Sequence, residues 1–356
     1  MRRVLLVAPF LWALACGNTD VGPEPLGANN GGGPDGGPGD GGTFVGADGG
    51  PIVSPDGGQV VIPANDPQIR FVTPANDTIR VDVKTLQPTT VLAKSYPSLT
   101  RTRDENSWDF FDPLTGRYIA QYQGNGGQFL WSVNGDAPQK VDFDGSSPIF
   151  QDVISWGVMT ADGQRVYLST SGGAYVATRK SQKLEFSAPV ALGQGVNVVH
   201  DVSRDNGRAA VSGNRLIKWG IAMNVVAPRQ VSIFALNADG TLGADKTSEY
   251  PPLASNYIEV PNFLADGTSL LYEGDDDIDT GDHLFTFRLG GQETELSPQP
   301  LAAQDFNTPC ALPDDRVVFW ESNNHDYTLR MFDPKANTTV TVHPQSQAFT
   351  GYIRCR

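Results

Sequence analysis

A pair of short strands joined by a tight turn recurs along this chain, and this repeat constrains the fold more than any other feature. Each copy has a turn containing Asp, Asn or Gly, followed by an apolar strand. Such turn residues accept the left-handed backbone of a hairpin at little cost. The copies are DPLTGRYIAQY (112–122), TADGQRVYLST (160–170), SRDNGRAAVSG (203–213), LADGTSLLYEG (264–274) and LPDDRVVFWES (312–322).

The spacing of these turns predicts a β-propeller. Counted at Gly116, Gly163, Gly207, Gly267 and Asp315, successive turns lie 47, 44, 60 and 48 residues apart. A period in the forties with several strands per unit is typical of propeller blades. The longest step includes the segment IKWGIAMNVVAPRQ, which we expect to form a long loop.

Further strands complete the units. After the turn at Gly267, the strand SLLYEG is followed by DHLFTFRL and QETELS. Upstream, residues 68–94 supply three strands, and the C-terminal TGYIRCR could supply the fourth. Closing a ring in this way removes exposed strand edges. We therefore expect an all-β fold, a single β-propeller of six four-stranded blades over residues 59–356, with five or seven blades as the alternatives.

The repeats resemble those of TolB-like and WD40-like β-propellers of exported bacterial proteins. The hallmark of that family is a PDG-like turn, then a strand, a polar loop and another strand. The turns TG at 115–116, NG at 206–207 and DD at 314–315 depart from this hallmark. The resemblance implies a scaffold that mainly binds proteins or ligands and only sometimes catalyses reactions.

The N-terminus predicts export. Arg2 and Arg3 precede a short apolar run that ends at Ala15, too short for a transmembrane helix, so residues 1–15 fit a signal peptide. The sequence ALAC resembles the lipobox of bacterial lipoproteins, although Ala13 stands where Leu is common. That resemblance implies that Cys16 becomes the N-terminus and carries diacylglycerol and palmitate. The alternative is an ordinary signal peptide with an incidental cysteine.

Residues 16–58 predict a flexible linker. They are dominated by Gly, Pro, Asp and Asn, with stretches such as GANNGGGPDGGPGDGG. Such a segment buries too little apolar surface to offset the entropy of ordering its glycines. Gly17 after the lipobox cysteine favours, by resemblance, the outer membrane of a bacterial cell envelope. Both the periplasmic and the surface-exposed face of that membrane remain alternatives for the location of the protein.

Two further cysteines predict a disulfide. Cys310 falls in the innermost strand of the sixth unit, and Cys355 lies in the strand that would complete the first blade. In an exported protein, two such cysteines in neighbouring strands are expected to pair. A Cys310–Cys355 bond would lock the ring. Two buried free cysteines are the alternative.

Charge and motifs narrow the functional classes. The net charge is −14, and removal of Arg2 and Arg3 makes it more negative, which argues against nucleic acid as a partner. The sequence contains no GxSxG, HExxH, CxxC or Walker motif. Neighbouring His and Asp residues occur at 200–201, 282–283 and 325–326, but adjacent residues on a strand point to opposite faces, so we expect no dyads from them.

One constellation suggests a ligand site. When the units are aligned on their turns, Asp109, Trp156 and His200 occupy the same offset in three successive innermost strands. These strands converge on the central channel of a propeller, so the three side chains could share a pocket at the tunnel mouth for a small polar ligand or a metal. An ordinary channel lining is the alternative.

The acidic run EGDDDIDTGDH is expected to be a loop between the middle strands of the fifth unit. Asp275, Asp277, Asp279 and Asp282 could form a loose calcium site, because calcium prefers several oxygens on a tight loop. The EF-hand pattern fails, since Thr280 and not Gly stands at the sixth position. We favour a solvated acidic turn and expect no other cofactor.

Together these features predict a lipid-anchored binding or assembly module of the cell envelope. Its expected partners are the membrane, through the N-terminal lipid, and an envelope protein. The alternatives are a propeller enzyme, a lyase or hydrolase with its site at the tunnel mouth, and a structural surface protein.

Overall fold

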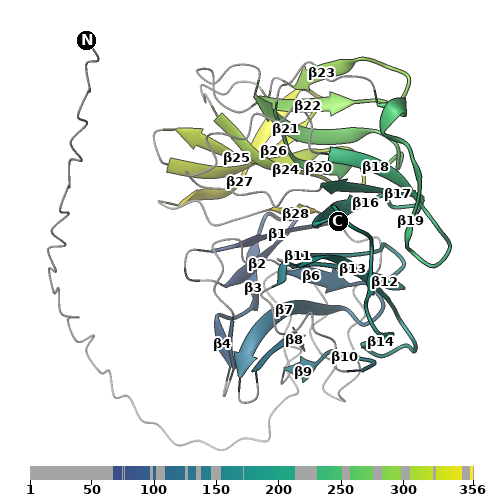
Figure 1. Cartoon of the computed structure of the whole chain (residues 1–356). Coiled ribbons are helices and arrows are strands. Elements are labelled where there is room, and N and C mark those ends of the chain that lie inside the picture. Colours follow the sequence, from purple (N-terminus) through teal and green to yellow (C-terminus); the bar gives the residue numbers. More distant parts are fainter. Residues whose placement is uncertain are drawn as a thin grey trace, which may run out of the picture. The chain divides into compact units, whose positions relative to one another are not determined.

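The structure is a computed structural model of the whole chain (Figure 1). It divides into two units, residues 1–42 and 43–356. The structure describes residues 67–355 except 74, 76, 97–98, 102–108, 125–126, 134–137, 146–153, 171, 213–230, 251–256, 276–282, 297, 299–304, 324–325 and 347–352. The predicted signal peptide, linker and long loop at 217–230 lie outside the described residues.

The described part of the chain is all-β, and its sheets form the six blades of a propeller. The first blade joins β28 (Arg354–Cys355) to β1 (Gln68–Val72), β2 (Thr78–Asp82) and β3 (Pro88–Leu92). The third contains β11 (Ile154–Met159), β12 (Arg165–Thr170), β13 (Gly173–Thr178) and β15 (Val190–Ala191). The fourth contains β16 (Val198–Val202), β17 (Arg208–Ser212), β18 (Val231–Leu236) and β19 (Leu242–Asp245).

The fifth and sixth blades have the same plan, with each strand antiparallel to the next. The fifth contains β20 (Tyr257–Phe263), β21 (Leu270–Asp275), β22 (His283–Phe287) and β23 (Glu293–Leu296). The sixth contains β24 (Asp305–Ala311), β25 (Val317–Asn323), β26 (Asp326–Asp333) and β27 (Thr338–Ser346). The expected six-bladed propeller is confirmed. Among the described residues the sole helix is a 3-10 turn, Thr247–Glu249, and no helix has the length and apolar character of a membrane span.

The second blade departs from the regular plan. Its innermost strand is split into β5 (Leu99–Arg101) and β6 (Phe110–Asp112), both of which pair with β7 (Arg117–Gly124). The rest of the blade consists of β8 (Gly127–Val133), β9 (Gln139–Lys140) and β4 (Ser95–Tyr96), the last paired with β5. A parallel pair, β10 (Asp142–Phe143) and β14 (Glu185–Phe186), links this blade to the third.

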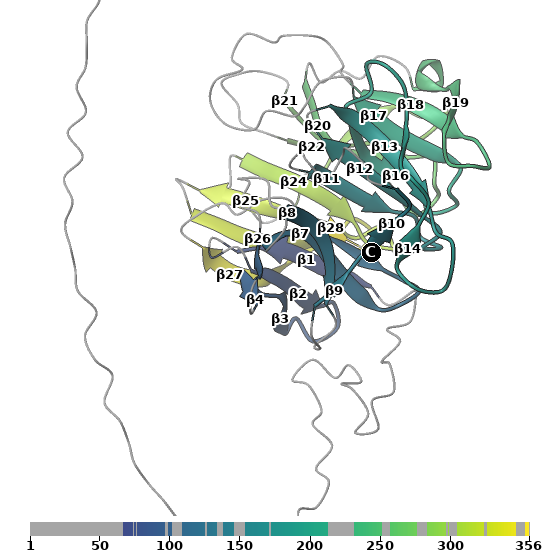
Figure 2. The same cartoon turned by 60° about the horizontal axis from the view of Figure 1, so that its bottom comes forward.

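The two ends of the domain close the ring. Strand β28 pairs with β1, Ile69 opposite Cys355 and Arg70 opposite Arg354, so the C-terminal segment completes the first blade as expected. The inner strands then contact one another in turn, β6 with β11, β11 with β16, β16 with β20, β20 with β24, and β24 with β28. Figures 1 and 2 show β28 near the middle of the domain, with the blades spread around it.

The tight turns follow the repeat, with one change of register. A left-handed residue occurs after the inner strand at Gly116, Gly163, Gly267 and Asp315, with φ between 68° and 70°. In the fourth blade this residue is Asn206, with φ of 57°, and not Gly207. The sequence alignment of that blade was therefore wrong by one residue, because Asn also tolerates this conformation.

Apolar clusters between neighbouring blades form the core. Phe71, Trp320 and Met331 belong to the cluster between the first and sixth blades, and Trp320 is 1% exposed. Equivalent clusters occupy the other five junctions. Burial of alternate strand residues against the next blade thus holds the ring together.

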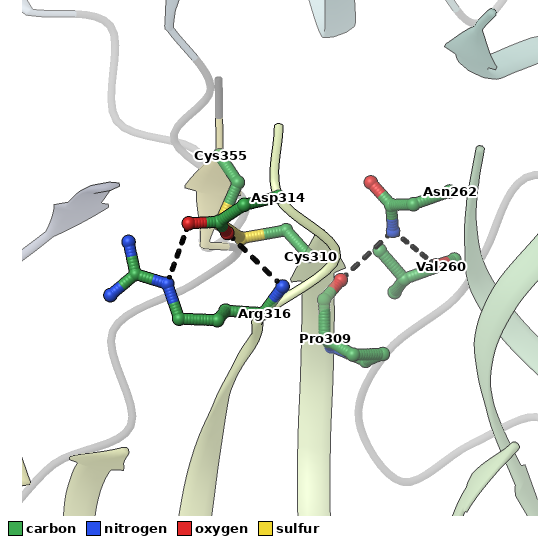
Figure 3. Close-up of a disulfide and its surroundings, with 7 residues drawn as sticks. All are labelled: Val260, Asn262, Pro309, Cys310, Asp314, Arg316 and Cys355. Atoms are coloured by element: carbon green, nitrogen blue, oxygen red, sulfur yellow. Dashed lines mark hydrogen bonds and ion pairs between the residues drawn. A yellow bond between two sulfur atoms is a disulfide. The ribbon is translucent and has the colours of Figure 1, made fainter. Parts of the chain in front are cut away.

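The predicted disulfide is present. Cys310 on β24 and Cys355 on β28 are bonded, with their Cα atoms 5.4 Å apart. Next to it, the Asn262 amide donates to the backbone oxygens of Val260, at 2.6 Å, and Pro309, at 2.8 Å (Figure 3). The inner strands of the fifth, sixth and first blades are therefore linked around the central axis.

Candidate ligand-binding site

A pocket of about 270 Å³ lies on the central axis of the propeller. Residues from the inner strands of all six blades line it, together with Arg70 of β1. They lie toward the carboxyl ends of these strands, next to the turns that contain Pro113, Ala161, Arg204 and Pro313. The pocket therefore opens among the loops that join each inner strand to the second strand. Its size suits a small molecule.

A β-bulge brings two adjacent residues of β16 to this pocket. The pairing of β16 with β17 shifts between Val199 and Asp201, which leaves His200 as the extra residue. Both His200 and Asp201 line the pocket as a result. The two side chains still have different neighbours: the His200 ring lies beside Trp156 of the third blade, and the Asp201 carboxylate accepts a hydrogen bond from Phe263 N of the fifth.

Asp109, one of the three predicted site residues, belongs to a buried network of charged groups. Its carboxylate accepts hydrogen bonds from Arg70 Nε at 3.1 Å and from Thr78 Oγ1 at 2.8 Å. The guanidinium of Arg101 lies 3.8 Å away and donates to Thr78 Oγ1 at 2.7 Å. Asp109 is 2% exposed, so this network joins the first two blades beneath the pocket.

Trp156 and His200 lie against each other. The indole Nε1 donates to the backbone oxygen of His200 at 3.1 Å, and the ring centroids are 6.0 Å apart. The guanidinium of Arg354 lies 3.7 Å from the centroid of the Trp156 ring, the geometry of a cation–π interaction. Asp109, His200 and Arg354 line the pocket, whereas Trp156 supports two of its lining residues from behind.

Burial shifts two titrating groups of the pocket in opposite directions. Burial, helped by the nearby Arg354, lowers the pKa of His200 to about 3, so its imidazole is neutral at physiological pH. Its Nε2 lies 3.0 Å from Ser212 Oγ, and its Nδ1 has no hydrogen-bond partner among the residues that the structure describes. Burial raises the pKa of Asp201 to about 6, against the opposing effects of hydrogen bonds from backbone N–H groups and of Arg204 and Arg354.

The arginines of the pocket were missed by sequence reasoning. Arg70, Arg204 and Arg354 all line it, and none lies at the offset used to align the units. Arg70 and Arg354 come from the strands that close the ring, so the predicted closure by TGYIRCR was the one signal that could have placed them together. The structure therefore changes the site from an Asp–Trp–His group to one in which three arginines join Asp109, Asp201 and His200.

The remaining site predictions fall elsewhere. His283 lies 2.7 Å from Glu295 across β22 and β23, and His343 packs against Phe71. His325 lies outside the described residues. The acidic run does connect β21 to β22, but Asp277, Asp279 and Asp282, and the side chain of Asp275, lie outside them too. Within the described part of the chain, no group of three or more His, Cys, Asp or Glu residues could hold a metal ion.

Known structures share the fold of this chain. No family model and no curated protein sequence matches it. A protein assigned as TolB from Agrobacterium tumefaciens is 14% identical, with a TM-score of 0.49 over 82% of this chain and 98% of that chain. TolB from Acinetobacter baumannii is 10% identical, with a TM-score of 0.49 over 81% of this chain and 65% of that chain, slightly less than two thirds.

A chain of a nidogen/laminin complex is 12% identical, with a TM-score of 0.50 over 81% of this chain and 98% of that chain. Because the identity is low, the similarity to this last chain concerns the architecture alone.

Proposed function

We propose that this protein is a lipid-anchored, cell-envelope propeller whose axial pocket binds a small ligand. The observation that carries the binding role is the pocket itself, to which the inner strands of all six blades contribute. A concave site with a few convergent polar groups among apolar ones is the usual form of a ligand site. The protein has the scaffold of a binding module, and its resemblance to TolB-like repeats supports a place in the envelope.

The chemistry of the lining supports the same role. Val158, Met159 and Pro313 are half-buried and contribute apolar surface. The polar groups converge on the pocket from β1 and β28 of the first blade, from the second blade at Asp109, and from β16 of the fourth blade. The side chain of His200 is 2% exposed and its Nδ1 has no hydrogen-bond partner within the described residues. A buried polar atom of this kind costs stability unless a bound molecule satisfies it.

A blocking variant tests the pocket. Ala161 lines the pocket from the exposed turn between β11 and β12, so Ala161→Trp should fill the opening without disturbing the core. The matched control is Ala336→Trp, on the exposed turn between β26 and β27. In a screen of small metabolites by thermal shift, we expect ligands that stabilise the wild-type protein and the control but not the blocked variant. A screen in which no ligand shows this pattern would contradict the proposal.

A second variant tests the anchor. We expect Cys16→Ser to abolish labelling of the protein by a palmitate analogue in a bacterial host and to move it from the membrane to the soluble fraction. Gly17→Ser is the control, because it leaves the cysteine in place. Labelling of the Cys16→Ser protein to the wild-type extent would show that another residue carries the lipid, and a wild-type protein that takes up no label would show that there is no lipid.

A further inference from the structure

Two arginines face each other across the seam of the ring. Arg70 on β1 and Arg354 on β28 are directly paired in the antiparallel register, and both line the axial pocket. Residues opposite one another on neighbouring antiparallel strands have close Cβ atoms, and like charges in this position repel. The strands that complete the propeller thus place two cations opposite each other at the wall of the pocket.

Two carboxylates lie close to these arginines. Asp109 contacts both Arg70 and Arg101. Asp201 interacts with both Arg204 and Arg354, and Arg204 also lies near Asp314 and Asp315.

Since His200 is neutral, the charged side chains among the described lining residues are those of Arg70, Arg204 and Arg354 and of Asp109 and Asp201.

Arg70 also has a hydrogen-bond donor that no described residue uses. Its side chain is 6% exposed, and its Nε is used by Asp109, but Nη1 has no acceptor among the described residues. A guanidinium has five N–H donors in a planar fork, which matches the two oxygens of a carboxylate or phosphate. His200 Nδ1, equally unpartnered within the described residues, lies on the same pocket.

We propose, building on the ligand-binding function above, that the axial pocket binds a small organic anion with a carboxylate or phosphate group. The anion lies between Arg70 and Arg354, where it relieves their repulsion and accepts hydrogen bonds from Arg70. Trp156 holds Arg354 in place through its ring face. The half-buried apolar lining residues Val158, Met159 and Pro313 receive the apolar body of the ligand, which favours an organic over an inorganic anion.

Calorimetry with matched probes tests the charge requirement on the unaltered protein. We expect benzoate and phenyl phosphate to bind at least tenfold more tightly than benzamide, which is neutral, and benzylamine, which is cationic. We also expect binding to weaken as salt rises, since ions screen the attraction. Equal binding of benzamide or benzylamine, or the absence of anion binding at millimolar concentration, would overturn the inference.

Variants then locate the site. Arg354→Gln should weaken benzoate binding about tenfold or more, as expected for the loss of a charge-assisted contact, and Arg354→Lys should restore part of it. Arg316→Gln, an arginine outside the pocket lining, is the control. Unchanged benzoate affinity in Arg354→Gln, or in the blocked Ala161→Trp protein, would refute the assignment to this pocket. If a neutral ligand binds the wild-type protein and Ala161→Trp prevents its binding, the proposal of an anionic ligand is refuted. The proposed ligand-binding function then still stands.

Discussion

Replacing Arg179 with methionine is expected to lower the free energy of unfolding by about 3–5 kcal/mol, the usual cost of leaving one charge of a buried pair without its partner. Arg179 Nη2 lies 2.6 Å from Asp112 Oδ1, and the two side chains are 1% and 0% exposed. Its other nitrogens donate to the backbone oxygens of Gly163 and Lys183, and its guanidinium lies 5.0 Å from the centre of the Phe186 ring. One side chain therefore connects the turn of the second blade to the third blade.

The chain provides a matched control in the next residue. Lys180 also forms a 2.6 Å ion pair, with Asp144, but both side chains are about half exposed. Exposed pairs contribute about 0–1 kcal/mol because water and salt screen them. Urea unfolding of Arg179→Met and Lys180→Met should differ accordingly, and equal losses would contradict the burial argument. The double variant Asp112→Asn/Arg179→Met should recover part of the loss, since it removes the unpaired charge.

Removing the disulfide is expected to cost about 2–4 kcal/mol, the typical contribution of a native crosslink. The bond joins residues 45 apart in sequence and restricts the unfolded chain. Cys310→Ala/Cys355→Ala, made together in a Cys16→Ser background, should have a lower melting temperature than the background protein. Reduction of the background protein with dithiothreitol should produce the same decrease and should not affect the double variant. A double variant as stable as its background would show that the strand pairing of β1 and β28 alone closes the ring.

Much of the fold was predictable because the spacing of the repeated turns indicates the number and the positions of the blades. Turn residues such as Gly116 and Gly267 must adopt a left-handed backbone, and few residue types do so readily, so their spacing reports the blades. The pairing of Cys310 with Cys355 followed from the same plan, because both positions could be assigned to innermost strands.

The site was less predictable for two physical reasons. A bulge adds a residue without leaving a clear signature, so the distance of His200 from its turn did not give the direction of its side chain. Arg70 and Arg354 lie near opposite ends of the folded domain, and an alignment of successive repeats does not compare them. Their juxtaposition depends on the register of β1 with β28, which sequence patterns define poorly for a two-residue strand.

The closure of the first blade by β28 also orders the folding of the chain. Strands β1, β2 and β3 are the first of the propeller to be synthesised, yet their sheet is completed only by Arg354 and Cys355. Contacts between such distant residues slow folding, because a large loop must be ordered before they form. The inner edge of the first blade therefore stays unpaired until Arg354 and Cys355 have been synthesised, and only then can Arg70 and Arg354 come together at the pocket.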